Sequence, residues 1–512
     1  MELLLGMDLG TTNIKAVAYT TQGAPLAEAS RPTPTRVMGL RRAEHDPDAL
    51  LQEAMSALRE VTSRLPRGAH ISGVAIASVG EAGVPLDEHS QVLYPIIAWY
   101  DERTTRQAEQ WATEIGATEV YRRTGLPLGH TFTLNKLMWL RENEQDVWSR
   151  MRRWLCVADY VAYRLTGEQR MGYSLASRTM ALDLRRRQWA EDLLAHVGEK
   201  ADLFPELAPE GSLVGHIADD AALATGLPKG TPVFVGGHDH ICGGLAVGAC
   251  YPGVVLDSTG TTEAELVTLE TVEPHLAKAD LSFCLGCHVV EGRYYAIGSI
   301  LGAGSMIGWL ADLLWPTERP ADREAALQAL TRAAAQSEVG ARGLYVLPHL
   351  AGAGSPDRDS TARGVFAGLT LEHTRADLAR AAIEGLAYEL RFLWEALERF
   401  SGQPIEHVVS VGGGARNALW SQIKADVTGH EMQVPEHVEA VTLGAAILAG
   451  LGAGIYGGLE DVRRSIHLPM AVTSPRPEAV PKYEERYRLL VTEIRPLAAA
   501  LGRKGALLAR RT

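Results

Sequence analysis

A short stretch near the beginning of the chain recurs about halfway along it. Residues 3–12 have the sequence Leu-Leu-Leu-Gly-Met-Asp-Leu-Gly-Thr-Thr, and residues 253–262 have the sequence Gly-Val-Val-Leu-Asp-Ser-Thr-Gly-Thr-Thr. In both, a short apolar run carries an Asp and ends in Gly-Thr-Thr. The apolar run predicts a buried strand, and Gly-Thr-Thr predicts the tight turn after it. Self-similarity of this kind indicates that one structural plan is used twice.

The segments around each copy alternate between strand and helix patterns. Residues 14–19 are rich in strand-forming residues, and Gln22-Gly23 indicates a hairpin turn after them. Further strands are expected at 71–78 and 408–411, and helices at 48–65, 378–400 and beyond Ala415. This is an α/β pattern built twice. The simplest architecture is two similar α/β domains that face a central cleft, with each Gly-Thr-Thr turn directed into it.

Length and sequence breaks suggest where the domains divide. With 512 residues, the chain exceeds the size at which one hydrophobic core usually stops growing, so two domains are expected. A Tyr-Pro-Gly break at 251–253 interrupts the pattern. We expect a first domain at 1–252, a second at 253–470, and a helical C-terminal tail at 471–512 that includes a basic, solvated stretch from Arg503 to Arg511.

Amino-acid composition and net charge argue against some classes of function. Hydrophobic residues make up 46% of the chain and charged residues 22%, which is typical of a soluble globular protein. The net charge of −12 argues against a nucleic-acid partner, because that binding relies on basic patches. A nucleotide substrate remains compatible with this charge, since it needs only a local site.

Targeting signals and disulfides are not indicated. The start of the chain contains Glu2 and lacks the basic region of a signal peptide. The five cysteines are too few and too scattered for a disulfide framework, and the CxxC at 284–287 favours a buried structural pair over zinc. The uncharged run at 440–459 is long enough for a membrane span, but its Gly, Ala and Thr content favours a helix packed closely on a sheet. We therefore expect a cytoplasmic protein without membrane association.

The Gly-Thr-Thr turns are suited to holding phosphate. A glycine lets the backbone approach a phosphate and direct N–H groups at it, and Thr hydroxyls add donors. In the first copy, Thr11 and Thr12 follow Gly10, Lys15 lies nearby in the sequence, and Asp8 could hold Mg²⁺ through water. An ordinary hairpin with a capping Thr is the alternative for either turn alone. Two such turns at matching positions favour phosphate binding.

A third glycine-rich element, Val-Gly-Gly-Gly-Ala-Arg-Asn, lies at 411–417. It follows an expected strand and precedes an expected helix, an order that can place a nucleotide's sugar or phosphate at the helix start. The sequence contains no GxxxxGK[ST] motif, which excludes a Walker-type P-loop enzyme. A GxGxxG match at 452–457 follows a helical Ala/Leu run instead of a strand, so it indicates close packing and not a dinucleotide site.

One carboxylate is placed where a catalytic base is needed. The segment 232–240, Pro-Val-Phe-Val-Gly-Gly-His-Asp-His, is a buried strand that ends in two glycines and a charged trio. This pattern builds a poor core but exposes a carboxylate at a strand end. Phosphoryl transfer to a hydroxyl needs an acceptor for the proton, and Asp239 is suited to that role. His238 and His240 either contact substrate or orient Asp239.

With these residues in place, the chain resembles the FGGY family of carbohydrate kinases, which includes glycerol, xylulose, gluconate, fuculose and rhamnulose kinases. The resemblance runs from about Leu3 to Gly457. Residues 364–384 fit the family's C-terminal signature throughout. Residues 131–143 nearly fit the N-terminal signature, which usually begins with an aromatic residue, Met, Gly or Ser where this chain has Thr131.

The resemblance implies an actin-like, ribonuclease-H-type fold in both domains, with sugar bound mainly by the first, ATP mainly by the second, and hinge closure around both. It implies that Asp239 is the catalytic base and that Asp8 is associated with Mg²⁺. The ATP-binding positions that it implies are Thr11, Thr12, Lys15, Gly260, Thr261, Gly304, Gly308, Gly413, Gly414 and Asn417. A homodimer is expected by family analogy alone.

The resemblance also indicates which segments, 77–83 and 97–103, face the sugar. There Glu81 would accept a hydroxyl and Trp99 would form an apolar wall, the usual combination for a sugar site. A surface Glu and a core Trp are the alternative. The expected substrate-binding residues are Gly80, Glu81, Trp99, Asp239 and His240.

The substrate itself stays open. Glycerol kinases typically have Arg-Glu where this chain has Gly80-Glu81, and xylulose and gluconate kinases usually have Met-His. The His before Asp239 resembles fuculose and rhamnulose kinases, although the Asp that those enzymes carry just after Gly-Val is absent. We expect a ketose (xylulose-type or related) or a polyol of four to six carbons, with fuculose- or rhamnulose-type, gluconate and tetrulose- or erythritol-type substrates as alternatives.

Two other classes of protein compete with a sugar kinase. One is an actin-fold ATPase that uses ATP as a conformational switch, and it predicts ATP turnover independent of any sugar. The other is a catalytically silent sugar sensor. The presence of Asp239 and the complete C-terminal signature oppose the first class, and the presence of Asp8, Asp239 and the phosphate turns opposes the second.

Overall fold

The computed structural model describes residues 1–39, 41–316, 323–436 and 439–498. The chain forms two compact units, each built from several segments. Apart from the gaps in these ranges, the first unit draws on residues 1–250, 268–296 and 439–468, and the second on 251–267, 297–436 and 469–498. The chain therefore returns to the first unit twice.

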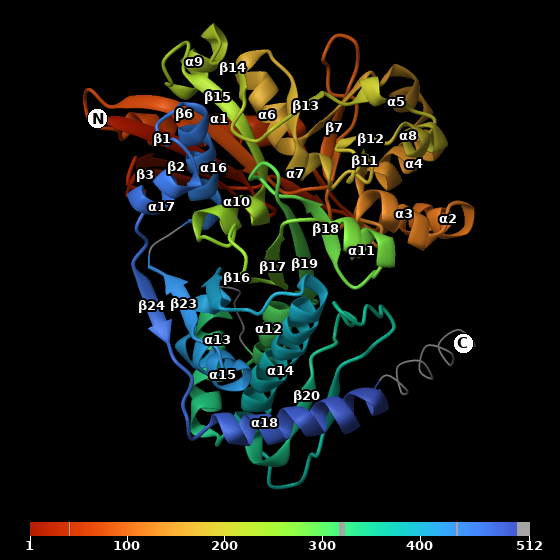
Figure 1. Cartoon of the computed structure of the whole chain (residues 1–512), viewed down its shortest axis with the longest axis vertical. Coiled ribbons are helices and arrows are strands. Elements are labelled where there is room, and N and C mark those ends of the chain that lie inside the picture. Colours follow the sequence, from red (N-terminus) through yellow and green to blue (C-terminus); the bar gives the residue numbers. More distant parts are fainter. Residues whose placement is uncertain (40, 317–322, 437–438, 499–512) are drawn as a thin grey trace. The chain divides into compact units, whose positions relative to one another are not determined.

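The first unit is built on a six-stranded sheet (Figure 1). In order across the sheet, the strands are β14 (Leu213–His216), β15 (Pro232–His238), β6 (His70–Ser78), β1 (Glu2–Leu9), β2 (Asn13–Thr20) and β3 (Pro25–Pro32). β1 pairs antiparallel with β2 and parallel with β6, and β2 pairs antiparallel with β3. The strands expected at 14–19 and 71–78 are confirmed. So is the hairpin turn at Gln22-Gly23, where Gly23 has a φ of 82°.

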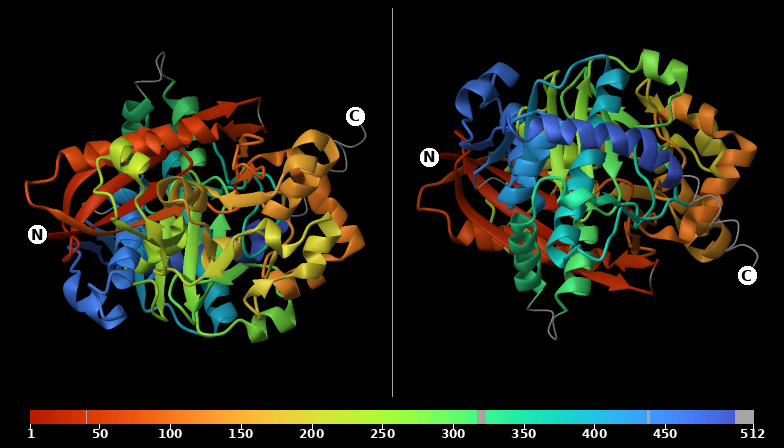
Figure 2. Two further views of the ribbon diagram at one scale, coloured as in Figure 1. Left: turned by 90° about the horizontal axis from the view of Figure 1, so that it is seen from above. Right: turned by 90° about the horizontal axis from the view of Figure 1, so that it is seen from below.

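Helices cover both faces of this sheet, since the consecutive β1 residues Leu3, Leu4 and Leu5 are each at most 1% exposed. On one face, α16 (Ala440–Gly452) packs against β1 and against α10 (Asp239–Ala246). A Cβ at Gly6 would lie only 1.7 Å from the carbonyl oxygen of Thr442, so only glycine permits this approach. α1 (Pro47–Ser63) packs on β2, β3 and α9 (Asp219–Thr225), which lie on the side seen in the left view of Figure 2.

The uncharged run at 440–459 is thus largely a helix packed closely on a sheet, as its small residues predicted. Within the described ranges, no helix has both the length and the apolar character needed to cross a membrane. All five cysteines are buried and free.

The remainder of the first unit consists of shorter elements. Its other helices are α2 (Thr105–Glu114), α3 (Ala117–Thr124), α4 (Thr133–Asn143), α5 (Gln145–Arg150), α6 (Val157–Thr166), α7 (Tyr173–Ala176), α8 (Glu191–Val197), α11 (Glu273–Lys278) and α17 (Leu459–Ser465). Its short strands are β4 (Thr35–Val37), β5 (Ala43–His45), β7 (Gly83–Leu86), β8 (Ile96–Ile97), β9 (Arg153–Cys156), β10 (Arg170–Gly172), β11 (Leu182–Asp183), β12 (Gln188–Trp189), β13 (Glu206–Ala208) and β18 (Cys284–Cys287).

The second unit has a sheet of its own. Its strands include, in order, β19 (Tyr294–Ile300), β17 (Glu263–Leu269), β16 (Val254–Thr259), β22 (His407–Val411), β23 (Met432–Pro435) and β24 (Met470–Thr473). A separate hairpin pairs β20 (Tyr345–Leu347) with β21 (Val365–Ala367). The main helices of the unit are α12 (Ala303–Leu314), α13 (Arg323–Gln336), α14 (Arg375–Ser401), α15 (Ala418–Thr428) and α18 (Val480–Leu489).

The repeat in the sequence is a repeat in the structure. β1 and β16 each lead through a Gly-Thr-Thr turn into an antiparallel partner, β2 or β17. Each also has a parallel strand on its other side, β6 or β22. The predicted fold class, two α/β domains of related plan, is confirmed.

The C-terminal segment packs on the second unit. Tyr483 of α18 is fully buried, and its hydroxyl accepts a hydrogen bond from Arg380 of α14 at 2.7 Å. α18 also contacts α15, which the right view of Figure 2 shows. The basic stretch from Arg503 to Arg511 lies outside the described residues.

Candidate active site

The turn between β1 and β2 is the first predicted phosphate loop. The backbone N–H of Gly10 donates to the carbonyl oxygen of Asn13 at 3.1 Å, which closes the turn. Thr11 is half-buried and Thr12 is exposed at its tip. The predicted tight turn is therefore present, and its hydroxyl groups lie at the end of the sheet.

Asp8 lies just before this turn, at the end of β1. Its Oδ1 atom is buried and has no hydrogen-bond partner among the described residues. Burial, followed by the negative charge of nearby Asp239, raises the pKa of Asp8 well above its ordinary value. An unsatisfied carboxylate oxygen of this kind fits a hydrated Mg²⁺ ion, because the cation would supply the missing positive charge.

Lys15 stands opposite Asp8 in the register of the hairpin. Its Nζ atom donates to Glu439 Oε2 at 2.6 Å, and the two side chains are 31% and 38% exposed. A pair this exposed contributes little to stability. Because Glu439 directly precedes α16, the pair instead fixes the position of the ammonium group next to Asp8.

Asp239 begins α10, directly after β15. Its side chain is 17% exposed and lies near that of Asp8. The Oδ1 atom of Asp239 accepts a hydrogen bond from the backbone N–H of His240 at 2.6 Å. The same oxygen lies 3.4 Å from His238 Nε2. Burial raises the pKa of Asp239 above its ordinary value. A carboxylate with raised proton affinity is better suited to accept a proton at neutral pH than a free aspartate.

Gly80 follows β6 and separates two larger side chains. A Cβ at this position would lie 2.9 Å from Arg178 Cγ and 2.9 Å from His238 Cδ2. Burial and the charge of Arg178 lower the pKa of His238 well below its ordinary value, so its ring is neutral at neutral pH. The Nδ1 atom of His238 has no partner within the part of the chain that the structure describes.

Glu81, predicted to accept a substrate hydroxyl, is ion-paired with Arg178. The Nε atom of Arg178 donates to Glu81 Oε1 at 2.7 Å, and Nη2 donates to the same oxygen. Glu81 is 5% exposed and has a φ of 61°, which is uncommon for a residue other than glycine. Arg178 Nη1 is buried, and no described residue accepts a hydrogen bond from it. The pair therefore leaves one guanidinium N–H buried, with the Tyr295 hydroxyl close to the guanidinium.

The other predicted substrate residues lie in the same neighbourhood. Trp99 is half-buried, packs edge-on against Tyr100 and donates its indole N–H to Thr11. His240 is half-buried, and its ring centroid lies 5.7 Å from that of His238. The first unit thus brings the predicted sugar residues close to the first phosphate turn.

In the second unit, the start of α12 supports the turn between β16 and β17. The backbone N–H groups of Gly304 and Ser305 donate to the carbonyl oxygens of Gly260 and Thr261, at 3.1 and 3.2 Å. A Cβ at Gly304 would lie 2.2 Å from the Gly260 oxygen, so a glycine is required for this approach. Gly308 is under less constraint, because a Cβ there would meet only the flexible end of Arg323.

The glycine-rich element after β22 packs against the same turn. Gly412 has a φ of 92°, and a Cβ there would lie 2.5 Å from the Thr259 carbonyl oxygen. A Cβ at Gly414 would lie 2.4 Å from the Thr259 methyl group. Around Gly413, in contrast, no other described atom lies within 4 Å of an added Cβ. Gly413 therefore leaves open space in front of the loop.

Asn417, predicted to contact the nucleotide, has a structural role in the second unit. It is the N-cap of α15, where its Oδ1 accepts the backbone N–H of Trp420 at 3.2 Å. Its Nδ2 donates to Thr331 Oγ1 of α13 at 3.0 Å. The side chain is thus engaged at both ends within the second unit.

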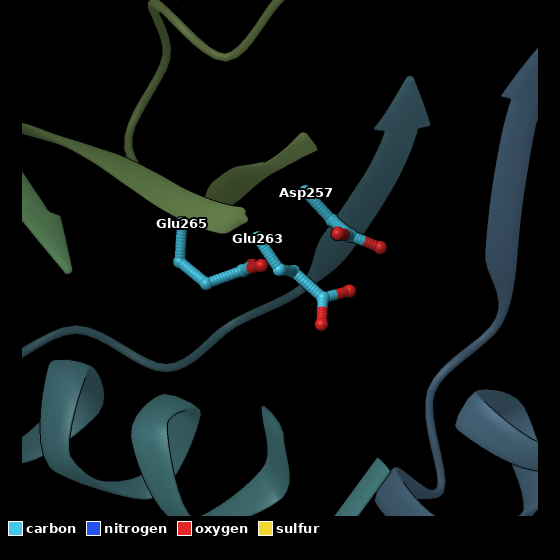
Figure 3. A group of neighbouring side chains, drawn as sticks. All are labelled: Asp257, Glu263 and Glu265. Carbon is cyan, nitrogen blue, oxygen red and sulfur yellow. The ribbon is translucent and has the colours of Figure 1, made fainter. Parts of the chain in front are cut away.

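One group of described side chains has the composition of a metal site. Asp257, Glu263 and Glu265 each offer an oxygen, and these oxygens lie within 4.8 Å of one another (Figure 3). All three residues are fully buried. However, the Nζ atom of Lys424 already donates to Asp257 Oδ2 at 2.7 Å and to Glu263. A protein cation therefore occupies the place that a metal would take.

Comparison with known proteins identifies the family. The models of the FGGY family of carbohydrate kinases match residues 3–246 with the N-terminal domain and residues 256–453 with the C-terminal domain. The chain belongs to the FGGY family of carbohydrate kinases. It is an enzyme that transfers phosphate from ATP to a sugar hydroxyl.

Relatives of this FGGY kinase differ in their named sugars. The xylulose kinase of Bacillus subtilis (strain 168) is 30% identical over 98% of this chain and 99% of that protein. The L-fuculokinase of Escherichia coli (strain K12) is 30% identical over 93% and 98%, and the gluconokinase of B. subtilis is 28% identical over 90% and 89%.

A solved structure carries the same fold. The xylulose kinase from Rhodospirillum rubrum matches with a TM-score of 0.86 and 30% identity, covering 97% of this chain and 100% of that chain. The two-domain α/β architecture of this FGGY kinase is therefore that of the family and consistent with the actin-like ATPase fold.

Sequence reasoning missed the partners of the site residues. Arg178 lies in a Ser-Arg-Thr segment whose only signal is a charged residue after an apolar stretch. Glu439 and Lys424 carried no motif signal at all. The structure supplies these partners because folding joins Arg178 to Glu81 and Glu439 to Lys15.

Proposed function

We propose that this FGGY kinase phosphorylates one hydroxyl of a ketose or polyol of four to six carbons, with Asp239 as the base. The observation that carries the proposal is the half-buried carboxylate of Asp239, which lies near Asp8 in a chain that matches the family through both domains. The raised pKa of Asp239 supports the role, because it increases the affinity of the carboxylate for the proton.

In the proposed reaction, the substrate hydroxyl oxygen forms a bond to the γ-phosphorus as the bond to the β–γ bridging oxygen breaks. The hydroxyl proton passes to Asp239, and ADP leaves with the bridging oxygen. Mg²⁺, held by Asp8 through water, would neutralise charge on the phosphates. Thr11, Thr12 and Lys15 would donate hydrogen bonds to phosphate oxygens.

We assign ATP binding to the two glycine-rich turns of the second unit. The backbone N–H of Gly260 closes the first turn by donating to the Thr262 carbonyl oxygen at 2.8 Å, so the backbone N–H and hydroxyl of Thr261 are the groups proposed to meet phosphate. The open space in front of Gly413 suits the nucleoside. Gly304, Gly308, Gly414 and Asn417 shape these turns. In this proposal Gly304 and Gly414 act through close packing, and Asn417 acts through the cap of α15.

The sugar-binding role of Glu81 is proposed to be indirect. Because Glu81 holds Arg178, the group offered to the substrate is Arg178 Nη1, with the neutral ring of His238 beside it. Both can hydrogen-bond to sugar oxygens. Trp99 supplies the apolar wall. The relatives do not select one sugar, since xylulose, fuculose and gluconate kinases have nearly equal identity to this chain.

A coupled ADP-release assay tests the proposal. The full chain with ATP and Mg²⁺ is screened against ketopentoses, ketohexoses, tetruloses, polyols and gluconate. We expect at least one ketose or polyol to stimulate ADP release tenfold or more over the rate without acceptor. Stimulation by gluconate alone would show that the acceptor is a sugar acid instead of a ketose or polyol. A sugar-independent rate equal to the stimulated one would favour an ATPase switch instead.

A further inference from the structure

A buried polar network lies on one face of the β16–β17 hairpin, next to the second Gly-Thr-Thr turn. Asp257 stands opposite Glu265 in the antiparallel register, and Thr259 stands opposite Glu263. Since side chains alternate along a strand, these four point to the same face. Each is completely buried, and Lys424 of α15 enters the group from outside the hairpin with 3% exposure.

Lys424 is fully satisfied at the centre of this network. Its ammonium group donates to Asp257 Oδ2 at 2.7 Å, to Thr259 Oγ1 at 2.8 Å and to Glu263. An ammonium group has three N–H donors, so none remains. The Thr259 hydroxyl in turn lies 2.9 Å from Asp257 Oδ1 and 3.1 Å from Glu263 Oε1, and donates to one of them.

The charges of the network balance around Lys424. Burial alone would raise the pKa of Asp257, but the Lys424 ammonium lowers it below the ordinary value, so Asp257 is anionic. Burial raises the pKa of Glu263 to about 7. Burial and the two neighbouring acids raise the pKa of Glu265 well above its ordinary value, and its Oε2 accepts the indole N–H of Trp394 at 2.6 Å. The Lys424 ammonium and the Asp257 carboxylate therefore form the charged core of the network.

Thr259 connects this network to both glycine-rich turns of the second unit. It directly precedes Gly260, so its backbone begins the first turn. Its carbonyl oxygen lies 2.5 Å from the position that a Cβ on Gly412 would take. Its methyl group lies 2.4 Å from the position that a Cβ on Gly414 would take. A movement of Thr259 would therefore displace the Gly260 turn and the 412–414 turn together.

We propose that Lys424 is a positioning residue for ATP, which acts through the hydroxyl of Thr259 to hold the Gly260 turn and the 412–414 turn in register. The inference rests on the proposed assignment of ATP to these turns. Lys424 itself is buried and does not touch the nucleotide. Its effect is on the geometry of the backbone groups that do.

The test separates positioning from general stabilisation. Thr259→Val keeps the shape and the methyl group but removes the hydroxyl, and Ser410→Ala is the matched control. Ser410 donates to Asp257 Oδ2 at 2.7 Å, so it belongs to the same network, yet its side chain bonds to neither turn. Each variant removes one hydroxyl group from the buried network around Asp257.

We expect Thr259→Val to raise the KM for ATP and the Kd for ADP, measured by calorimetry on the full chain, by about tenfold. The KM for the phosphoryl acceptor should change less than twofold. Ser410→Ala should leave the Kd for ADP within twofold of wild type, and Thr259→Ser, which restores the hydroxyl, should return most of the lost affinity. Lys424→Met should resemble Thr259→Val if it folds.

Two results would overturn the inference. One is a Thr259→Val enzyme with unchanged KM for ATP, and the other is an equal loss of ADP affinity in Ser410→Ala. Both leave the proposed function intact, because they are measured against a wild-type enzyme that phosphorylates its acceptor. Failure of the wild type to phosphorylate any sugar or polyol would instead remove the proposed function.

Discussion

Trp99 donates its indole N–H to the hydroxyl group of Thr11 at a distance of 2.9 Å. The first residue is expected to line the sugar site, and the second belongs to the first phosphate turn. This hydrogen bond therefore joins two parts of the site that the sequence presents 88 residues apart. If Trp99 contacts the sugar as proposed, it can in this way influence the position of the Thr11 hydroxyl that is proposed to bind phosphate.

Replacing Trp99 with Phe should weaken this connection while keeping most of the apolar wall. Loss of a partly buried neutral hydrogen bond costs about 1 kcal/mol, so we expect kcat to fall roughly fivefold because Thr11 is less well positioned. Steady-state kinetics with ATP and the best acceptor measure the effect. Trp189→Phe is the matched control, since the Trp189 ring stacks on Phe204 and belongs to the β11–β12 hairpin instead of the turn. An equal loss in both variants would count against the link.

Much of the fold is predictable from the sequence because its signals are local. Apolar runs that end in Gly-Thr-Thr specify a strand and a turn without reference to distant residues, and both hairpins form where expected. The strands around 71–78 and 408–411 follow from the same kind of pattern. The repeat then implies the related order of strands in both units.

The site is only partly predictable, for a physical reason. Asp239 could be identified because a carboxylate at a strand end is a poor core residue, and Asp8 because it precedes a predicted phosphate turn. The Glu81–Arg178 pair spans 97 residues and the Lys15–Glu439 pair spans 424. Such pairs depend on the packing of whole elements, so the sequence did not indicate Arg178 as the partner of Glu81 or Glu439 as the partner of Lys15. For the same reason Glu81 was predicted as a direct hydroxyl acceptor, a role that the structure leaves untested.

Asp239→Asn tests the proposed base directly. The amide keeps the size of the side chain but cannot accept the hydroxyl proton, so kcat should fall by about 10² to 10⁴. The KM for ATP should change little, because the substitution keeps the side chain's size and leaves every residue assigned to ATP in place. Rapid-quench and steady-state kinetics provide the measurement. A variant with near-normal turnover would remove Asp239 from the role of base.

Two glycines of the second unit should tolerate replacement by alanine to different degrees. In Gly304→Ala the new Cβ would stand 2.2 Å from the Gly260 carbonyl oxygen, so the start of α12 must move away from the turn. We expect the KM for ATP to rise at least tenfold. Gly413→Ala adds a Cβ into space free of other described atoms within 4 Å, so stability should be unchanged. Thermal unfolding of both variants, with and without ADP, distinguishes the two cases.

The buried pair of Glu81 and Arg178 predicts strong coupling between two substitutions. Glu81→Gln leaves the Arg178 guanidinium buried without its counter-charge, which should lower the free energy of unfolding by about 3 kcal/mol. The double variant Glu81→Gln/Arg178→Met removes both charges and should recover at least half of that loss. Urea unfolding of the single and double variants gives the coupling energy. Simple addition of the two single effects would contradict a direct pair.

The second unit should lose stability in acid through Glu389 of α14. Burial alone would raise the pKa of this carboxyl group, but Arg495 and then His349 lower it to about 2. His349 Nε2 lies 3.1 Å from Glu389 Oε2, and Arg495 donates to the other carboxylate oxygen. Because the folded-state pKa lies below the unfolded value of 4.5, the ionised pair stabilises the fold above about pH 4.5.

This contribution, about 3 kcal/mol in full, is lost progressively as the pH falls from about 5 towards 2. The measurement is the free energy of unfolding in urea at pH 7, 5 and 3 for the wild type and for Glu389→Gln. The variant should be less stable at pH 7, and the difference should shrink as the pH falls. Because every other titrating group is common to both proteins, a difference that stays constant over this range would show that Glu389 is not paired in solution.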